Sequence, residues 1–206
     1  DHRLLVINHQ FVAAAKRTPA CVVGDGKRTI RDLVAEVNKD PRRGFGHEKV
    51  LTQIDIDDHT EKILAKLGLT ADSVPKKDEV IYLKATANLS TGGTADDISE
   101  SVHPYNVFMA ERISRIIDLD ICGIDIMTED ITQPLTESGG AVLEVNAAPG
   151  FRMHLDPTGG LGRNVAEPVV DMLFPPGTPS RIPIIAVTGT NGKTTTTLLT
   201  HHILQK

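Results

Sequence analysis

The sequence predicts an α+β protein in which an antiparallel sheet with helices occupies residues 1–173. A proline-rich segment follows at 174–183, and a strand, glycine loop and helix of α/β type begin at 184. Three observations predict this arrangement. Two apolar runs, I-C-G-I-D-I-M and A-V-L-E-V-N, flank a polar connector within 121–146 and indicate a hairpin. The segment F-P-P-G-T-P-S-R-I-P cannot hold a helix or a central strand. After it, the apolar run I-I-A-V precedes T-G-T-N-G-K-T-T, the order expected of a buried parallel strand and its loop.

The remaining elements follow from local patterns. Residues 3–8 and 11–16 indicate two strands joined by a tight turn at 8–10. Apolar residues recur at helical spacing in 29–37, where Thr29 is placed to cap the helix. We also expect helices at 58–67, 104–118 and 164–173, and a strand at 80–83. The connector at 40–46 is polar and glycine-rich, so Arg42 and Arg43 within it are expected to be solvated.

Composition excludes several classes of partner. The chain has 206 residues, of which 40% are hydrophobic and 24% charged, and its formal net charge is −5. An acidic balance gives no footprint for nucleic acid or for an anionic membrane, so neither is expected as a partner. The sequence has no apolar run of membrane-spanning length and no C-x-x-C pair around Cys21 or Cys122, which favours a cytoplasmic protein.

The hairpin at 121–146 carries a predicted metal site. Alternation along each strand places Asp125 on one face of the first strand and Glu144 with Asn146 on one face of the second. Facing residues of an antiparallel pair lie close enough for the three side chains to converge. Two carboxylates and an amide oxygen suit Mg²⁺ held together with nucleotide phosphates. The alternative for Asp125 is an ordinary surface carboxylate.

The loop after residue 187 predicts a phosphate-binding site for ATP. Its glycines let backbone N–H groups turn toward phosphate, Lys193 can reach the β and γ phosphates, and Thr194 can hold Mg²⁺ at the start of a helix. The general P-loop has glycine where this chain has Val187. The predicted phosphate cradle consists of Gly189, Thr190, Asn191, Gly192, Lys193, Thr194 and Thr195.

Two further groups are candidate substrate ligands. The loop K-A-T-A-N-L-S-T-G-G-T offers short polar groups at Asn88, Ser90 and Thr91 beside a flexible glycine pair. Arg152 could grip a substrate carboxylate in two places. An ordinary polar loop and a rim arginine without a special role are the alternatives.

Three motifs resemble those of known ligases. I-D-I-M followed by L-E-V-N-A-A-P-G resembles the metal-binding end of the ATP-grasp ligases, and the whole chain resembles the cyanophycin synthetase family. The D-alanine–D-alanine ligases of that superfamily carry an arginine where this chain has Gly123, which argues against that activity. G-T-N-G-K-T-T resembles the loop of the Mur-type ligases. The resemblance implies the C-terminal part of an ATP-grasp domain at 1–173, a linker at 174–183 and the start of a Mur-ligase-like domain at 184–206.

The resemblance also implies an activity. In that family, ATP and Mg²⁺ drive polymerisation of aspartate and arginine into multi-L-arginyl-poly-L-aspartate through acyl phosphates, on a growing primer. It implies metal-binding roles for Asp125, Glu144 and Asn146, and a place for Arg3 and Arg17 facing the phosphates or the acyl phosphate. The alternative for either arginine is a solvated cation at a strand end. We expect the chain to be part of a longer, homo-oligomeric enzyme and to be inactive by itself.

Two other functions stay open from the sequence. One is an ATP-grasp carboxylate-amine ligase of different substrate choice, similar to glutathione synthetase or to peptide-tailing enzymes. The other is a non-catalytic fragment that binds nucleotide through its glycine loop. The predicted metal triad disfavours pure binding, and the second nucleotide loop disfavours a ligase with one ATP site.

Overall fold

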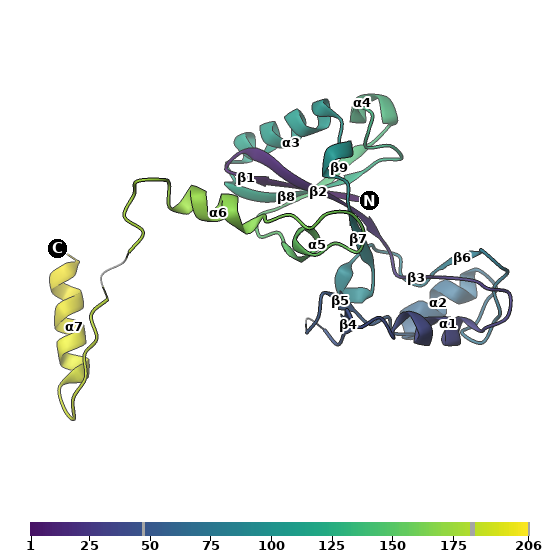
Figure 1. Cartoon of the computed structure of the whole chain (residues 1–206), viewed down its shortest axis with the longest axis horizontal. Coiled ribbons are helices and arrows are strands. Elements are labelled where there is room, and N and C mark those ends of the chain that lie inside the picture. Colours follow the sequence, from purple (N-terminus) through teal and green to yellow (C-terminus); the bar gives the residue numbers. More distant parts are fainter. Residues whose placement is uncertain (47, 182–183, 206) are drawn as a thin grey trace. The chain divides into compact units, whose positions relative to one another are not determined.

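The computed structural model describes residues 1–46, 48–181 and 184–205 of the chain. It divides into two compact units, Asp1–Leu173 and Phe174–Lys206. The first unit holds the sheets and most of the helices, and the second holds one helix after an extended segment (Figure 1). Within the described residues, no helix is both long and apolar enough to cross a membrane.

The first unit is built on a five-stranded antiparallel sheet in the order β7-β2-β1-β8-β9. The central strand β1 pairs with β2 on one side and with β8 on the other, so the predicted N-terminal hairpin is confirmed. The predicted pairing of β8 with β9 is confirmed as well. The strands are β1 (His2–Ile7), β2 (Gln10–Thr18), β7 (Thr94–Asp97), β8 (Ile121–Met127) and β9 (Ala141–Asn146).

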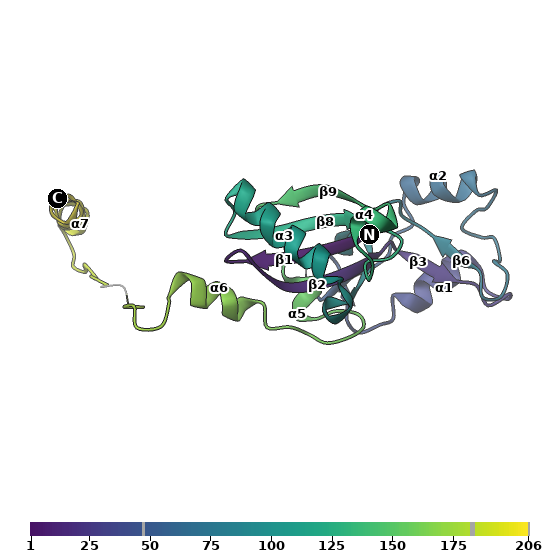
Figure 2. The ribbon, with the colours of Figure 1, turned by 90° about the horizontal axis from the view of Figure 1, so that it is seen from above.

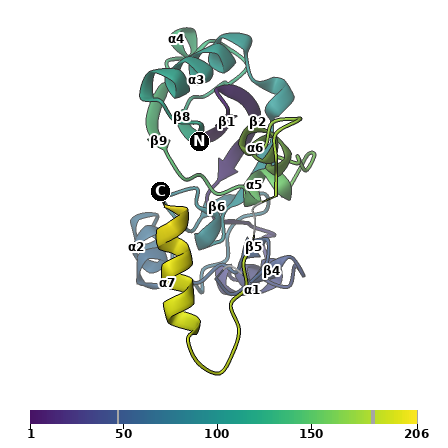
Figure 3. The same cartoon turned by 90° about the vertical axis from the view of Figure 1, so that its left-hand side faces the viewer.

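Strand β1 is buried along its whole length because both faces of the sheet are covered. Leu4 and Val6 belong to a core that includes Ala110 of helix α3 (Pro104–Ile117). On the opposite face, Leu5 and Ile7 meet Val165 and the apolar side of α6 (Ala166–Leu173). Helices α3 and α6 therefore sandwich the sheet (Figure 3). Alternating side chains of one strand supply both cores, which is why its sequence is apolar without interruption.

A smaller lobe is inserted between β2 and β7. Its two-stranded antiparallel sheet pairs β3 (Cys21–Val23) with β6 (Val80–Tyr82), beside α1 (Ile30–Val37) and α2 (Asp58–Lys66) (Figure 2). Thr29 caps α1 through a reciprocal capping box with Asp32, as its position predicted. Ile30, Leu64 and Leu83 are fully buried and give this lobe a core of its own.

The first unit also contains several short elements. Strands β4 (Arg43–Gly44) and β5 (Leu51–Thr52) form a parallel pair, and single turns of 3₁₀ helix lie at Leu89–Thr91 (η1) and Ser99–Ser101 (η2). Helices α4 (Leu135–Ser138) and α5 (Arg152–Leu155) are one turn each.

The second unit contains α7 (Lys193–Leu204), which begins directly after the glycine loop, as predicted. The strand expected at 184–187 is not formed, and that prediction was wrong. An apolar strand needs neighbouring strands to satisfy its backbone groups and cover its side chains. No strand in the described part of the chain pairs with this segment, and the Ile184 side chain is 91% exposed.

Candidate functional site

A buried charge cluster lies where β1, β2 and β8 run side by side. The register places Arg3 of β1 directly across from Asp125 of β8. The Arg3 guanidinium donates from Nε to one Asp125 carboxylate oxygen and from Nη2 to the other, at 2.9 Å. Arg17 of β2 donates from Nη2 to Asp125 Oδ2 at 2.9 Å and to Asp1 Oδ1 at 2.6 Å. Two arginines therefore bind one aspartate.

Burial makes this cluster different from a surface ion pair. Arg3 and Arg17 are each 8% exposed, and Asp125 is 4% exposed. Burial alone would raise the pKa of the Asp125 carboxyl, but hydrogen bonding and charge from Arg3, with the charge of Arg17, hold the pKa below its usual value. Asp125 is therefore a permanent buried anion. The alternative of a solvated cation is wrong for both Arg3 and Arg17, because both side chains are buried and bind Asp125.

The other two predicted metal ligands stand on the neighbouring strand. Glu144 of β9 faces Asp125 across the ladder, and Asn146 faces Gly123. A bulge at this point adds one residue to β9, because Asp125 pairs with Glu144 while the adjacent Ile126 pairs with Val142. Asn146 Nδ2 donates to Glu144 Oε1 at 3.0 Å, which fixes the two side chains together. Glu144 is exposed, whereas Asp125 is buried.

The donor set fits Mg²⁺, provided that part of the coordination comes from elsewhere. A carboxylate has about four lone-pair sites, and Asp125 already uses three of them for the two arginines. It can therefore give one oxygen contact. The carboxylate of Glu144 and the amide oxygen of Asn146 can give further oxygen contacts to the metal. Among the described residues no three acidic, histidine or cysteine side chains gather at one point. Such a site resembles those in which Mg²⁺ takes its other ligands from water and phosphate.

Gly123 makes room for the cluster. A Cβ at this position would lie 2.9 Å from Cδ of Arg3 and 2.8 Å from Cβ of Pro149. Those distances are shorter than real Cβ contacts, so any side chain here would displace the Arg3 guanidinium from Asp125. The Arg3 side chain of β1 thus occupies the space that a side chain at position 123 would need.

The predicted substrate loop lies around η1 and lines a cavity of about 370 Å³. Ser90 and Thr91 contribute to its wall, together with Lys84 and Asp57. Asn88 is exposed, and its backbone oxygen accepts hydrogen bonds from the amides of Thr91 and Gly93. These bonds close the loop into a compact turn. Contact between substrate and the hydroxyl groups of Ser90 and Thr91 stays a prediction.

Arg43 holds this loop in place, although the sequence indicated a solvated side chain. It is 6% exposed, and its Nη1 donates to the carbonyl oxygens of Thr52 at 2.6 Å and Gly92 at 3.0 Å. The prediction for Arg43 was wrong because the short parallel pair of β4 and β5 folds the connector over its side chain. Arg42, next in sequence, does lie at the surface and pairs with Asp40.

We expect Arg43→Gln to destabilise the first unit by about 1–3 kcal/mol, because two buried carbonyl groups would lose their charged donor. The free energy of unfolding is measured by urea titration of the full-length protein. Arg42→Gln is the matched control and should change it by less than about 0.5 kcal/mol. Equal effects of the two substitutions would show that Arg43 does not hold the loop.

Other polar residues have different roles from those predicted, or were missed. The guanidinium of Arg152 donates to the carbonyl oxygen of Lys49 at 3.2 Å, and its predicted contact with a substrate carboxylate stays untested. Lys84 begins the predicted loop but was not singled out. It is buried and pairs with Asp57 at 2.7 Å. Its position between an apolar strand and a polar loop is a signal that could have marked it.

His154 of α5 is a second residue that the sequence did not single out. The side chain is buried, and Nε2 has no hydrogen-bond partner among the described residues. Burial, with the charge of nearby Arg3, lowers its pKa to about 4, so the ring is neutral at pH 7. A neutral histidine beside the arginine cluster adds no further positive charge.

In the second unit, the glycine loop predicted to bind phosphate directly precedes α7. Gly189 and Gly192 have φ values of 138° and 78°, and Gly192 caps the start of α7. The Lys193 side chain folds back over the loop and donates to the carbonyl oxygens of Gly189 and, at 3.3 Å, of Thr190. The ammonium group is thus bound by backbone oxygens of its own loop, and phosphate binding by this loop stays a prediction.

Comparison with known proteins shows which sequences the chain is similar to. No family model matches the chain. Cyanophycin synthetase of Crocosphaera subtropica is 60% identical to it over all 206 residues. The chain is therefore similar along its whole length to a segment of cyanophycin synthetase. The glutathione biosynthesis bifunctional protein GshAB of Clostridium perfringens is more distant, with 36% identity over 174 residues, or 84% of the chain and 22% of that protein.

A solved structure supports the fold. The bifunctional glutathione synthetase from Pasteurella multocida superposes on 84% of this chain and 24% of its own, with a TM-score of 0.72 and 35% identity. The predicted antiparallel ATP-grasp lobe is therefore confirmed at the level of a mixed α and β fold, whereas the Mur-ligase-like part stays a prediction. The chain spans about a quarter of the length of the cyanophycin synthetase that it matches.

Proposed function

We propose that this chain forms part of an ATP-dependent ligase that polymerises aspartate and arginine into multi-L-arginyl-poly-L-aspartate. One observation carries the proposal, namely 60% identity to cyanophycin synthetase over every residue of the chain. The cluster of Arg3, Arg17 and Asp125 beside Glu144 supports it, because amide synthesis from a carboxylate needs charge stabilisation around ATP phosphates. Mg²⁺ bound by Asp125, Glu144 and Asn146 would supply charge neutralisation on those phosphates.

The residues of the first unit would position the reacting groups and hold the charge of Asp125 beside them. A terminal carboxylate of the primer attacks the γ phosphate of ATP, and ADP leaves as an acyl phosphate forms. The α-amino group of aspartate then attacks the acyl carbon, and phosphate leaves as the amide forms. Arg3 and Arg17 keep Asp125 ionised and fix its orientation through both of its oxygens. The loop with Ser90 and Thr91 would hold the acceptor.

The second unit would serve the arginine step. Backbone N–H groups at Gly189 to Gly192 and the ammonium group of Lys193 would bind the phosphates of a second ATP. To do so, Lys193 must exchange its contacts with Gly189 and Thr190 for phosphate oxygens. The side-chain carboxylate of the newly added aspartate would then be phosphorylated and joined to the α-amino group of arginine.

The test is phosphate release from ATP by the full-length protein with Mg²⁺ and a primer, with aspartate and arginine added separately. We expect Lys193→Ala to abolish turnover that depends on arginine and to leave turnover that depends on aspartate. Lys193 faces solvent, so folding should be unchanged. If neither amino acid stimulates the wild-type protein, the substrate assignment fails. Stimulation by other amino acids would favour a ligase of the glutathione synthetase kind.

A further inference from the structure

Helix α5 lies over the sheet face that carries Arg3. Its residue Met153 packs against a small core that includes Ala15, and Ala15 pairs with Arg3 across the β1–β2 ladder. Just before the helix, Phe151 packs against the core that contains Leu5, the next residue of β1 on the same face. Helix α5 therefore belongs to a buried layer that covers the arginine cluster.

His154 of this helix has a polar atom that the fold does not use. The side chain is 2% exposed, and its Nε2 has no hydrogen-bond partner within the residues that the structure describes. A buried polar atom without a partner is destabilising, so an apolar side chain would suit this position better if it served packing alone. The histidine therefore points to a role that needs its ring nitrogen.

Arg3 has N–H groups to spare in the same layer. A guanidinium carries five N–H donors, and Asp125 accepts from Nε and Nη2 of Arg3. Nη1 donates no hydrogen bond to any residue that the structure describes. Burial, and after it the charge of Arg3, lowers the pKa of His154, so the ring is neutral and one of its nitrogens can accept a hydrogen bond. The spare donors and the unused nitrogen are complementary.

An ion pair fixes the segment that follows α5. Arg163 donates from Nε and Nη2 to the two carboxylate oxygens of Asp97 on β7, at 2.9 Å and 3.1 Å. Its backbone amide donates to the carbonyl oxygen of His154 at 2.8 Å. The Asp97 amide donates to the carbonyl oxygen of Gly159, where a Cβ would lie 2.7 Å from Oδ1 of Asp96. The backbone of His154 is thus tied to the edge of the sheet.

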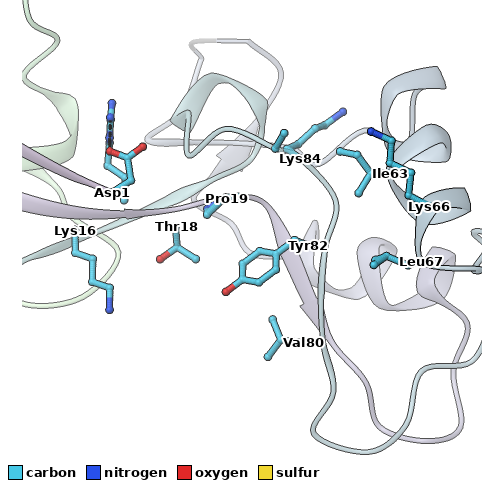
Figure 4. Close-up of a pocket in the computed structure, with 12 residues that line it drawn as sticks. Asp1, Lys16, Thr18, Pro19, Ile63, Lys66, Leu67, Val80, Tyr82 and Lys84 are labelled. Atoms are coloured by element: carbon cyan, nitrogen blue, oxygen red, sulfur yellow. Dashed lines mark hydrogen bonds and ion pairs between the residues drawn. The ribbon is translucent and has the colours of Figure 1, made fainter. Parts of the chain in front are cut away.

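Solvent reaches the arginine cluster from a different side. Asp1 and Arg17 line a cavity of about 670 Å³ at the end of β2, where Figure 4 shows the Asp1 side chain. His154 lines neither this cavity nor the one beside the substrate loop. Its ring offers no surface to a ligand, so an effect of His154 on the reaction must pass through Arg3.

We propose that His154 is a positioning residue for Arg3. Its Nε2 accepts one of the spare guanidinium N–H groups when substrate occupies the cluster, and this keeps Arg3 aligned on Asp125. The hydrogen bond needs the neutral tautomer that carries its proton on Nδ1. The inference rests on the proposed function, in which Asp125 holds its charge beside the reacting phosphates.

The test compares two substitutions of His154 in the full-length protein. Glutamine keeps a polar acceptor, whereas methionine fills a similar volume without one. We expect His154→Met to lower the kcat of aspartate-dependent phosphate release about tenfold at an unchanged KM for aspartate, and His154→Gln to lower it less than about threefold. The melting temperature should show the opposite order, with His154→Met at least as stable as wild type, because methionine buries no unpartnered polar atom.

His59→Met is the matched control, because His59 is an exposed histidine on α2. It should leave kcat within about twofold of wild type. Action through Arg3 is tested in an Arg3→Lys background, since lysine lacks the planar fork that binds both oxygens of Asp125. There His154→Met should lower kcat by less than about twofold. The shifts in urea midpoint caused by His154→Met and Arg3→Lys should also differ from a simple sum.

Three results would overturn the proposal. A kcat of His154→Met within about twofold of wild type would show that Nε2 has no role in turnover. Equal losses of kcat in His154→Gln and His154→Met would leave packing as the only role of the ring. Additive shifts in urea midpoint would show that His154 does not act through Arg3. The proposed function fails separately, when aspartate does not stimulate phosphate release by wild type, and the urea measurement then still decides whether the two side chains are coupled.

Discussion

Glu144→Gln is expected to lower aspartate-dependent phosphate release by the full-length protein about 100-fold or more, with no change in melting temperature. Glutamine keeps the shape of the side chain and an oxygen that accepts the hydrogen bond from Asn146. Only the charge is lost. In the proposed site that charge supplies one of two carboxylates for Mg²⁺, and a missing charge at a phosphoryl-transfer centre costs several kcal/mol of transition-state stabilisation.

The measurement is steady-state phosphate release at saturating ATP, as a function of Mg²⁺ concentration. Glu137→Gln is the matched control, because Glu137 is an exposed glutamate on α4. It should leave turnover within about twofold of wild type, as expected for a surface substitution away from the site. Turnover of Glu144→Gln equal to wild type would refute the metal role of Glu144. Arginine-dependent turnover should survive this substitution, since the glycine loop of the second unit is untouched.

Period-two alternation was enough to predict how β8 and β9 meet. Asp125 and Glu144 face each other across the pair, as expected from alternation along two paired antiparallel strands. The bulge that shifts Val142 by one place was not predicted, since it depends on hydrogen bonding between strands. The helices at 30–37 and 104–117 followed from apolar spacing and from their capping residues, Thr29 and Pro104.

Partners that are distant in sequence could not be predicted from local patterns. Arg3 and Asp125 are 122 positions apart, and only the register of β1 against β8 brings them together. Arg43 lies in a connector that looks solvated, yet tertiary packing buries it. Conversely, the residues at 184–187 have the composition of a buried strand without the neighbouring strands that would form one. Burial of Arg43 and exposure of residues 184–186 therefore depend on segments that are distant in the sequence, and local patterns do not contain that information.

Asp125→Asn should destabilise the first unit by roughly 3–5 kcal/mol, the usual cost of removing one partner from a buried ion pair. Asparagine fills the same volume but leaves the buried guanidinium groups of Arg3 and Arg17 without a compensating charge. Thermal unfolding of the full-length protein measures the loss. Asp120→Asn is the control, because the Asp120 side chain is 73% exposed and its carboxylate lies 3.8 Å from Nε2 of His9.

The dependence on pH separates a charge effect from a packing effect. Asp125 has a lowered pKa in the folded protein, so its ionised form favours folding at any pH above the pKa of an unfolded aspartate, about 3.9. The stability difference between wild type and Asp125→Asn should be constant from pH 7 to about pH 5. It should then narrow as the pH falls toward the folded pKa and the carboxylate is protonated. A difference that persists unchanged in acid would indicate lost packing instead.

A second substitution tests whether the two arginines cause the instability. Adding Arg17→Met to Asp125→Asn removes one of the two uncompensated cations, and a methionine can occupy the apolar part of its volume. The double variant should therefore be more stable than Asp125→Asn alone, although Arg17→Met by itself should be destabilising because it removes a partner of Asp125. If the two losses simply add, Arg17 and Asp125 are not coupled, and the charge cluster does not organise this end of the sheet.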